Sequence, residues 1–425
     1  MTRAKRRDFL RFLLFGALSG CDSAPVLGSP PKVPAPRPKA SNPIENLDNS
    51  KIEVYPASKA FQTPEPSLEL ELPLYKSFPA LKQKLPHIRL ATLPTPIEKL
   101  ESLGRRKGLN HLYIKRDDLC GDSYGGSKIR KLEWLLGDAV HSKSTGVITF
   151  GAAGSNHAVA TALYAKQLNL QCLLMLLPQP PSEDIRHKLM VSHSLGAQIQ
   201  IRPTLKAAQK AAARMAKENN SGPSFYVVES GGSSPLGNIG LVNAAFELKE
   251  QIEAGLLPEP DFIYMALGTM GSAVGLLIGL MAAGLKSALI PVRASSLDTS
   301  GENQFLSMFG ATVNELHRAD PSFPELKIVR EQTRIEGRYL GGGYGIKTQK
   351  GEEARSLFHE ETGLSLEHTY TGKTLAALLD HAGALRNKSI LFWNTFGSRT
   401  IPIEMHSPES LPKEIQPFFR AVPRG

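Results

Sequence analysis

Short apolar runs that alternate with longer helix-like segments most constrain how this sequence can fold. The run at 171–177 precedes a helical pattern at 183–195, and the run at 225–228 precedes one at 238–255. Parallel strands need crossover connections of about a dozen residues or more, usually helices. The chain has 425 residues, 41% of them hydrophobic, which is enough for two lobes of this kind. The pattern therefore predicts an α/β protein with open, mostly parallel sheets and helices on both faces.

Lys128 ends a Gly-Gly-Ser-Lys segment at the point where a helical pattern begins. A lysine in this position is poorly placed for core packing and well placed to present its amine to a ligand carbonyl. The amine reacts with a carbonyl only after losing its proton, which requires burial or a cationic neighbour. Arg130 and Lys131 would supply that neighbour if the fold turns them inward. The alternative is a solvated basic patch at the start of a surface helix.

Residues 151–157 form a turn of small and polar residues between the apolar run 146–150 and a helical pattern at 158–168. Ligands of α/β proteins bind at the carboxyl ends of parallel strands, where this turn would lie. The turn would present Ser155, Asn156 and His157. Ser155 and Asn156 would equally well cap the helix, which is the alternative interpretation.

A glycine-rich turn follows the strand-like run 262–266 and opens into an apolar helix near Gly271. Backbone N–H groups at a helix N-terminus, without Cβ atoms to block approach, favour an anion such as phosphate. The Gly-Lys-Ser/Thr of a P-loop is missing. Close packing of strand on helix is the alternative. The residues that we expect to hold the anion are Gly268, Thr269, Met270, Gly271 and Ser272.

Three segments near the C-terminus add aromatic rings and hydroxyl groups. Tyr344 is flanked by glycines, which would let its ring approach a flat ligand. Tyr370 and Thr371 precede a helical pattern, and Thr395 follows the apolar run 390–393. Each segment alone is compatible with an ordinary turn. Together with Lys128 they supply an amine, an anion site, aromatic surfaces and hydroxyl donors.

In this order the segments resemble the D-cysteine desulfhydrase and 1-aminocyclopropane-1-carboxylate (ACC) deaminase family, pyridoxal-phosphate enzymes of the tryptophan-synthase-β fold, fold type II. The resemblance extends from about residue 86 to about residue 402. Its most specific part consists of the segments 116–119, 125–128 and 130–133. It implies a small domain at 131–240 and a large domain made of 85–130 and 241–425.

The resemblance also implies a role for each candidate residue, a small amino acid as substrate, and a homodimer. Lys128 would form the Schiff base with pyridoxal 5'-phosphate and move the substrate's α-proton. The other residues expected to be catalytic are Ser155, Tyr344 and Tyr370. The cofactor would contact Asn156, Gly268, Thr269, Met270, Gly271, Ser272, Tyr344 and Thr395, with Asn156 bonded to its 3′-oxygen and Thr395 to its pyridine nitrogen. The substrate would contact Ser155, Asn156, His157, Tyr370 and Thr371.

Two positions distinguish the branches of this family. Thr371 and Thr395 occur where ACC deaminases have Glu and Leu, so the resemblance favours the elimination of sulfide from D-cysteine. Asn394 and Phe396 depart from the family's His-Thr-Gly-Gly segment, and Phe396 places a benzyl group beside the expected ring site. Two alternatives therefore stay open: ACC deaminase activity, and a homologue that binds pyridoxal phosphate without turnover.

The N-terminal residues 1–21 resemble an export signal. Arg6 and Arg7 precede a short apolar stretch and match a twin-arginine signal, and Cys21 ends a lipoprotein-like cleavage sequence. A chance basic start with a buried cysteine is the alternative. Residues 22–84 would form a Pro- and Ser-rich tether and an N-terminal extension. We expect a lipoprotein, lipid-anchored through Cys21 at the periplasmic face of a bacterial membrane.

The remaining composition adds no further class of partner. The formal net charge is +10, but the basic residues are spread along the chain without interleaved aromatic residues, so no nucleic-acid partner is expected. Besides Cys21 the cysteines are Cys120 and Cys172, which have neither metal-ligand nor redox-pair spacing. No metal site is expected.

Overall fold

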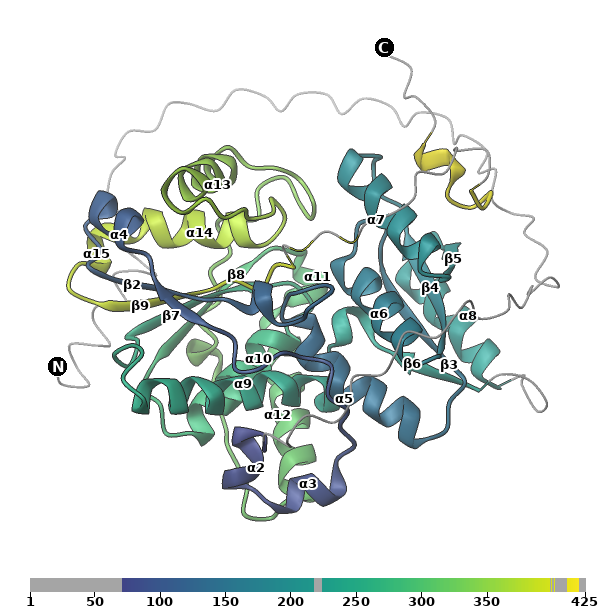
Figure 1. The fold of residues 1–425 in the computed structure, drawn as a ribbon, viewed down its shortest axis with the longest axis horizontal. Coiled ribbons are helices and arrows are strands. Elements are labelled where there is room, and N and C mark those ends of the chain that lie inside the picture. The colour runs from purple at the N-terminus through teal and green to yellow at the C-terminus, as the bar shows by residue number, and fades with distance from the viewer. Residues whose placement is uncertain (1–70, 218–223, 398, 400, 402–410, 420–425) are drawn as a thin grey trace, which may run out of the picture. The chain divides into compact units, whose positions relative to one another are not determined.

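The computed structural model describes residues 71–217, 224–397, 399, 401 and 411–419 (Figure 1). Arg6, Arg7 and Cys21, with the rest of the expected signal and most of the tether, lie outside these residues. All described residues belong to one structural unit. Within the described ranges, no helix is long and apolar enough to cross a membrane.

The strands that the structure describes form two sheets. The five-stranded sheet has the order β1-β2-β9-β7-β8, with β1 antiparallel to β2 and the other pairs parallel. The four-stranded sheet has the order β5-β4-β3-β6 and is fully parallel. The strands are β1 (Ile97–Lys99), β2 (His111–Lys115), β3 (Gly146–Ala152), β4 (Gln171–Leu177), β5 (Gln198–Ile201), β6 (Phe225–Val228), β7 (Phe262–Leu267), β8 (Ala288–Arg293) and β9 (Ser389–Trp393).

Helices cover both faces of the sheets. In Figure 1, α9 and α10 lie below the five-stranded sheet, and α13 and α14 lie above it. The helices are α2 (Pro73–Ser77), α3 (Ala80–Lys84), α4 (Glu101–Lys107), α5 (Lys128–His141), α6 (Asn156–Gln167), α7 (Glu183–Ser194), α8 (Leu205–Lys217), α9 (Pro235–Glu253), α10 (Gly271–Ala282), α11 (Leu297–Ser300), α12 (Glu302–Ala319), α13 (Gln349–Thr362), α14 (Thr371–Asp380) and α15 (Ala382–Leu385). Short 3-10 turns are η1 (Asp117–Leu119), η2 (Ser230–Gly232), η3 (Arg330–Gln332) and η5 (Gln416–Phe418).

The four-stranded sheet shows why its strands are continuous apolar runs in the sequence. Val147 and Leu174 point to one hydrophobic cluster, which includes residues of α5 and α6. Their neighbours Ile148 and Leu173 point to the opposite cluster, which includes Ala208 of α8. A strand covered on both faces has no polar side to alternate with its apolar side. The expected mostly parallel α/β architecture is confirmed.

Part of the expected N-terminal extension belongs to the folded core. Leu74 and Tyr75 of α2 and Leu81 of α3 are buried in the cluster that also contains residues of α9. The backbone N–H of Leu74 donates to the side chain of Asn243 at 3.0 Å. The domain boundaries expected at 130/131 and 240/241 fall within α5 and α9, which pack on each other, and they stay a prediction.

A cluster of buried charges lies where α5, α9 and the five-stranded sheet meet. Arg130 donates to Asp117 at 2.8 Å and to Glu247 at 2.9 Å. Lys115 donates to Glu247 at 2.5 Å, and Trp393 donates its indole N–H to Asp117 at 2.8 Å. Together these five residues form what we call the buried ion cluster. The two cations lower the pKa of Glu247 to about 2 against the opposing effect of burial.

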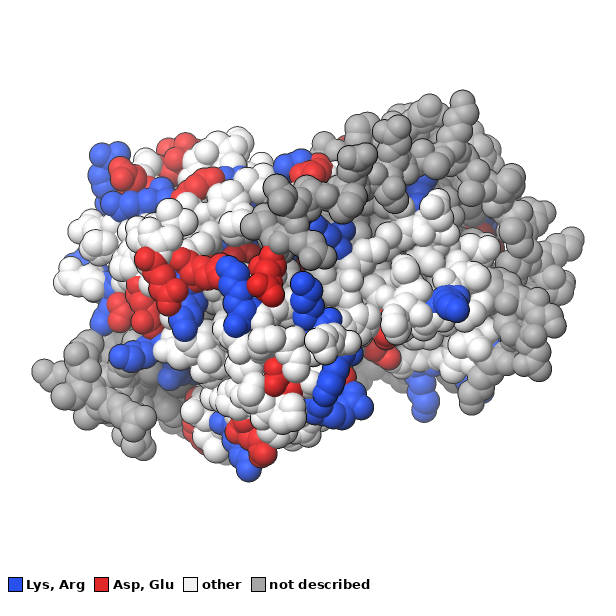
Figure 2. Space-filling view, turned by 60° about the horizontal axis from the view of Figure 1, so that its bottom comes forward, with Lys and Arg blue, Asp and Glu red and all other residues white. Residues whose placement is uncertain are grey.

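On the face shown in Figure 2, acidic and basic side chains are interspersed, and the basic ones do not gather into a single stripe. A field of mixed sign gives little long-range attraction for a polyanion.

Glu247→Gln should destabilise the fold far more than Glu250→Gln on the same helix. The first change leaves Lys115 buried without a carboxylate, which costs roughly 3–5 kcal/mol. Glu250 pairs with Lys76 at 2.7 Å, but both side chains are about half exposed, and such a pair contributes less than about 1 kcal/mol. Urea unfolding followed by tryptophan fluorescence would measure both changes, and equal effects would contradict a structural role for the cluster.

Candidate active site

The turn that leads to Lys128 is packed against the residues after β9. A Cβ atom at Gly125 would lie 1.8 Å from the carbonyl oxygen of Asp118, and Gly126 has a φ of 101°, so both positions require glycine. The N–H of Ser127 donates to the carbonyl oxygen of Thr395 at 3.3 Å. The structure therefore brings the predicted residues Lys128 and Thr395 together, although they are far apart in the sequence.

Lys128 is the first residue of α5, and no hydrogen bond or ion pair joins its amine to any described residue. Burial of the amine lowers its pKa from 10.5 to about 8, although the residue keeps some solvent exposure. Arg130 does point inward, but Asp117 and Glu247 neutralise its charge. Burial is thus the cause that favours the reactive, neutral form of the Lys128 amine.

Lys131 lies at the N-terminus of α10, where the anion site was predicted. A Cβ atom at Gly271 would lie 2.6 Å from Lys131 Nζ, 2.7 Å from Ser233 Oγ and 2.1 Å from Asn238 Oδ1. The Lys131 amine donates to the carbonyl oxygen of Gly231 at 3.2 Å and to Ser233 at 2.9 Å, and no carboxylate among the described residues pairs with it.

These contacts fit a phosphate group. Burial and the charge of Lys128 hold the pKa of Lys131 far below its ordinary value, and an anion beside it would favour its charged form. The amides of Ser272 and Ala273 belong to the first turn of α10, where a helix offers them no carbonyl partner. Thr269 adds a hydroxyl at 2.7 Å from Ser233. Lys131 and Ser233 would therefore hold the phosphate together with the predicted residues Gly268 to Ser272.

Met270 gives the turn its shape. It has a φ of 68°, which is unfavourable for a residue other than glycine, and it precedes the first helical residue. Its side chain is buried in the core of the five-stranded sheet. The backbone of Met270, rather than its side chain, therefore belongs to the anion site.

The turn after β3 caps α6. Ser155 accepts a hydrogen bond from the N–H of Ala158 at 3.3 Å, so the capping interpretation of Ser155 is confirmed, and a ligand contact stays a prediction. Asn156 accepts a hydrogen bond from the hydroxyl of Tyr124 at 3.4 Å. The N–H of Gly154 donates to the side chain of Gln179 at 2.7 Å.

His157 lies below this turn rather than at its surface. Its ring is buried, and Nε2 is 2.9 Å from the hydroxyl of Thr149. Burial, with the charges of Lys128 and Lys131, holds the pKa of His157 well below its ordinary value. The ring is therefore held by Thr149 on β3, and its expected contact with substrate stays a prediction.

Tyr344 and Tyr370 meet over the anion-binding turn. Their hydroxyl oxygens are 2.9 Å apart and their rings are edge to face, with centroids 5.9 Å apart. A Cβ atom at Gly268 would lie 3.0 Å from the ring of Tyr370. Burial raises the pKa of both tyrosines, so both hydroxyls stay protonated and can donate a proton or a hydrogen bond.

Thr371 is fully buried and contacts Glu367 rather than solvent. The amides of residues 369–371 donate to the Glu367 carboxylate at 2.6 to 3.0 Å, and the Thr371 hydroxyl lies 3.1 Å from it. Glu367 therefore caps the N-terminus of α14 and fixes the position of Tyr370. The sequence analysis missed Glu367, for which the signal was an acidic residue four positions before the start of a helix.

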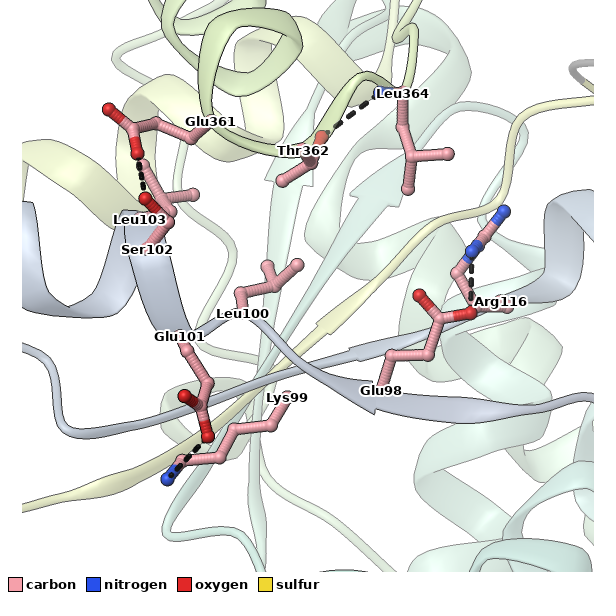
Figure 3. A pocket seen from close by; sticks show the side chains of 10 residues that line it. All are labelled: Glu98, Lys99, Leu100, Glu101, Ser102, Leu103, Arg116, Glu361, Thr362 and Leu364. Atoms are coloured by element: carbon pink, nitrogen blue, oxygen red, sulfur yellow. Dashed lines mark hydrogen bonds and ion pairs between the residues drawn. The ribbon is translucent and has the colours of Figure 1, made fainter.

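A hollow at the end of β1 lies apart from the predicted residues (Figure 3). Paired side chains form part of its wall: Arg116 lies 2.6 Å from Glu98, and Lys99 lies 3.6 Å from Glu101. None of the predicted site residues lines it, so we do not assign it to the site. Its lining consists of Glu98, Lys99, Leu100, Glu101, Ser102, Leu103, Arg116, Glu361, Thr362 and Leu364.

The geometry of the site defines a class of protein. The buried amine of Lys128 has no counter-ion and acts electrostatically on Lys131, whose amine lies at the anion site, and the hydroxyls of Tyr344 and Tyr370 meet beside that site. Such an arrangement suits a phosphorylated carbonyl compound that reacts with a lysine.

Comparisons with known proteins identify that compound. The family model described as "Pyridoxal-phosphate dependent enzyme" matches residues 88–395. A D-cysteine desulfhydrase of Klebsiella pneumoniae is 31% identical over 324 residues, which cover 74% of this chain and 95% of that protein. A Pyrococcus furiosus protein with a provisional name as 1-aminocyclopropane-1-carboxylate deaminase is 33% identical over 323 residues, covering 75% and 94%. The crystal structure of an ACC deaminase homologue matches with a TM-score of 0.66 at 30% identity, covering 76% of this chain and 94% of that one.

The chain belongs to the family of pyridoxal-phosphate-dependent enzymes that contains proteins named ACC deaminase and D-cysteine desulfhydrase. The predicted fold type II and the predicted cofactor, pyridoxal phosphate, are confirmed. The roles expected of the individual residues, including the ring-nitrogen contact of Thr395, stay predictions.

The attachment of pyridoxal phosphate to the cofactor-free protein should depend on pH through Lys128. Below the pKa of about 8 the rate should rise about tenfold per pH unit, because only the neutral amine reacts, and above it the rate should level off. Stopped-flow absorbance would measure this rate, with Lys128→Ala as the control that shows no attachment. A rise that continues to about pH 10 would mean that the amine is not desolvated.

Lys131→Met should weaken the binding of pyridoxal phosphate roughly 10- to 100-fold, the usual effect of losing a charge-assisted hydrogen bond. Pyridoxal, which lacks the phosphate, should bind both proteins alike. Lys206→Met, at an exposed position of α8, provides the matched control. Equal losses for the two ligands in fluorescence titrations would show that Lys131 does not contact the phosphate.

Proposed function

We propose that this protein removes sulfide and ammonia from a small amino acid, most simply D-cysteine. Cysteine and one water give pyruvate, hydrogen sulfide and ammonia, so atoms balance without an oxidant. The proposal rests on the family and on one observation of the site: the desolvated amine of Lys128 lies within electrostatic range of Lys131 at the anion site, beside which two protonated tyrosine hydroxyls meet.

The predicted residues divide the steps of this reaction among them. The neutral amine of Lys128 takes the α-proton, for which a pKa near the working pH is most effective. Bound pyridoxal phosphate supplies the electron sink for the electrons left on the α-carbon. The hydroxyl of Tyr370, which donates to Tyr344 at 2.9 Å in this structure, turns toward the departing sulfur and delivers its proton there. Ser155 and Asn156, at the N-terminus of α6, bind the substrate carboxylate.

ACC deamination is the second candidate, because relatives with both names match at similar identity, 33% and 31%. Residue 371 favours the first candidate. A threonine there, with its hydroxyl already bonded to Glu367, provides no carboxylate for the pyridine nitrogen. Thr395, our expected partner of that nitrogen, is also uncharged. Without a carboxylate partner, the pyridine ring is a weaker electron sink. A weaker sink suffices to expel a good leaving group such as sulfide, but it does not suffice to open a carbon ring.

The decisive measurement is kcat/KM for D-cysteine against ACC on one preparation of the purified holoenzyme. We expect a ratio well above one, with Lys128→Ala inactive on both substrates. A ratio below one would assign the chain to the ACC branch. No release of ammonia from either substrate, or from L-cysteine, β-chloroalanine and D-serine, would favour a binding protein in which Phe396 blocks the site.

We further propose that the protein is exported with its cofactor bound and is lipid-anchored through Cys21. The twin-arginine route carries folded proteins, which suits an enzyme that acquires its cofactor in the cytosol. The support for this is the pair Arg6 and Arg7 followed by the cleavage-like sequence before Cys21.

Fractionation of cells that produce the tagged full-length chain tests this export. Replacement of both arginines by lysine should leave the protein in the cytoplasm, and Cys21→Ser should abolish labelling by radioactive palmitate. Palmitate on the Cys21→Ser variant would refute lipid anchoring through Cys21. Unchanged export of the double lysine variant would refute export by the twin-arginine route.

A further inference from the structure

The loop that holds Tyr344 is short of regular structure and rich in glycine. Gly341, Gly343 and Gly345 all have positive φ, at 67°, 138° and 72°, so its path depends on backbone angles that other residues rarely adopt. Such a loop has few intrinsic restraints. The position of the Tyr344 ring therefore depends on contacts from outside the loop.

Lys373 restrains the loop from the side of the five-stranded sheet. This residue lies in the first turn of α14 and is fully buried. Its amine donates to the carbonyl oxygens of Leu340 at 2.7 Å and Gly343 at 3.2 Å. The same helix begins next to Tyr370, whose hydroxyl contacts that of Tyr344 at 2.9 Å. The start of α14 thus holds both the loop, through Lys373, and Tyr370, the partner of Tyr344.

Gln179 meets the loop from the side of the four-stranded sheet. It lies in the connection between β4 and α7, and its Oε1 accepts the N–H of Gly154 at 2.7 Å. Its Nε2 faces the opposite way, 3.1 Å from the place that a Cβ atom at Gly345 would occupy. Gly154 directly precedes Ser155, and Gly345 directly follows Tyr344. One side chain therefore binds the residue before Ser155 and lies next to the residue after Tyr344.

We propose that Gln179 is a positioning residue that fixes the turn of Ser155 and the loop of Tyr344 relative to each other. The substrate contacts of Ser155, beside the four-stranded sheet, and of Tyr344, beside the five-stranded sheet, then keep a fixed spacing. Gln179 itself does not touch the reacting atoms. The coupling of turn and loop by Gln179 does not depend on which substrate the enzyme acts on. The expected effect of Gln179 on substrate binding rests on the proposed function.

Two variants separate the two ends of the Gln179 side chain. Gln179→Glu keeps the oxygen that accepts from Gly154 and replaces the nitrogen that faces Gly345. Gln179→Leu removes both polar ends at similar size. Gln200→Glu is the matched control, since Gln200 lies on β5 of the same sheet and accepts from Arg202 at 2.6 Å, away from the site.

Hydrogen exchange of the full-length holoprotein, measured by mass spectrometry, reads the coupling directly. Gln179→Leu should speed exchange about fivefold in the peptide that covers 150–156, the effect of one lost hydrogen bond, and should also speed exchange in 341–347, where the loop loses its polar neighbour. Gln179→Glu should do so only in 341–347, and Gln200→Glu in neither. Unchanged exchange at 341–347 in both Gln179 variants overturns the coupling, and so does an equal rise in the peptide 171–177, which would mean a general loss of packing.

Kinetics test the second half of the proposal. Both Gln179 variants should raise KM for D-cysteine about fivefold or more while kcat and the visible absorbance of the bound cofactor stay near the wild-type values. An unchanged KM alongside faster exchange at 341–347 overturns the positioning role. If the wild-type protein turns over no substrate, the proposed function fails, and the exchange pattern still decides the coupling on its own.

Discussion

The carboxylate of Asp117 connects the two segments on which the site depends. It binds the guanidinium of Arg130 at 2.8 Å and the indole N–H of Trp393 at 2.8 Å. Arg130 comes two residues after Lys128, and Trp393 comes two residues before Thr395. Because neither partner can move far without leaving a buried charge or donor unpaired, one carboxylate fixes the start of α5 against the end of β9.

The same cluster determines how the site lysine is activated. A cation next to Lys128 would lower its pKa by repulsion, and the sequence places Arg130 close enough for this. In the fold, Asp117 and Glu247 surround that guanidinium, so its charge is balanced and burial is left as the cause of the shift. Lys131 would bind the phosphate instead of activating Lys128, because its amine lies at the N-terminus of α10 and faces the anion site.

The sequence predicted the elements better than the contacts between them. The bounds of β4 and β6 agree with the predicted runs, since strands covered on both faces are continuously apolar. The buried ion cluster was not predicted, because a charged segment has the same composition whether it is solvated or paired inside. Nor could the contact of Gln179 with the Tyr344 loop be foreseen, as it joins residues more than a hundred positions apart through a path that only the folded chain defines.

Thr371 belongs to the set of contacts that fixes the start of α14 and the position of Tyr370. The N-terminus of α14 already holds the carboxylate of Glu367, which accepts from three consecutive amides and contacts the Thr371 hydroxyl. A glutamate at 371 would bring a second carboxylate beside the first in a buried setting, where like charges repel strongly. The uncharged Thr371 avoids this repulsion and adds its own hydrogen bond to the carboxylate that fixes the start of α14.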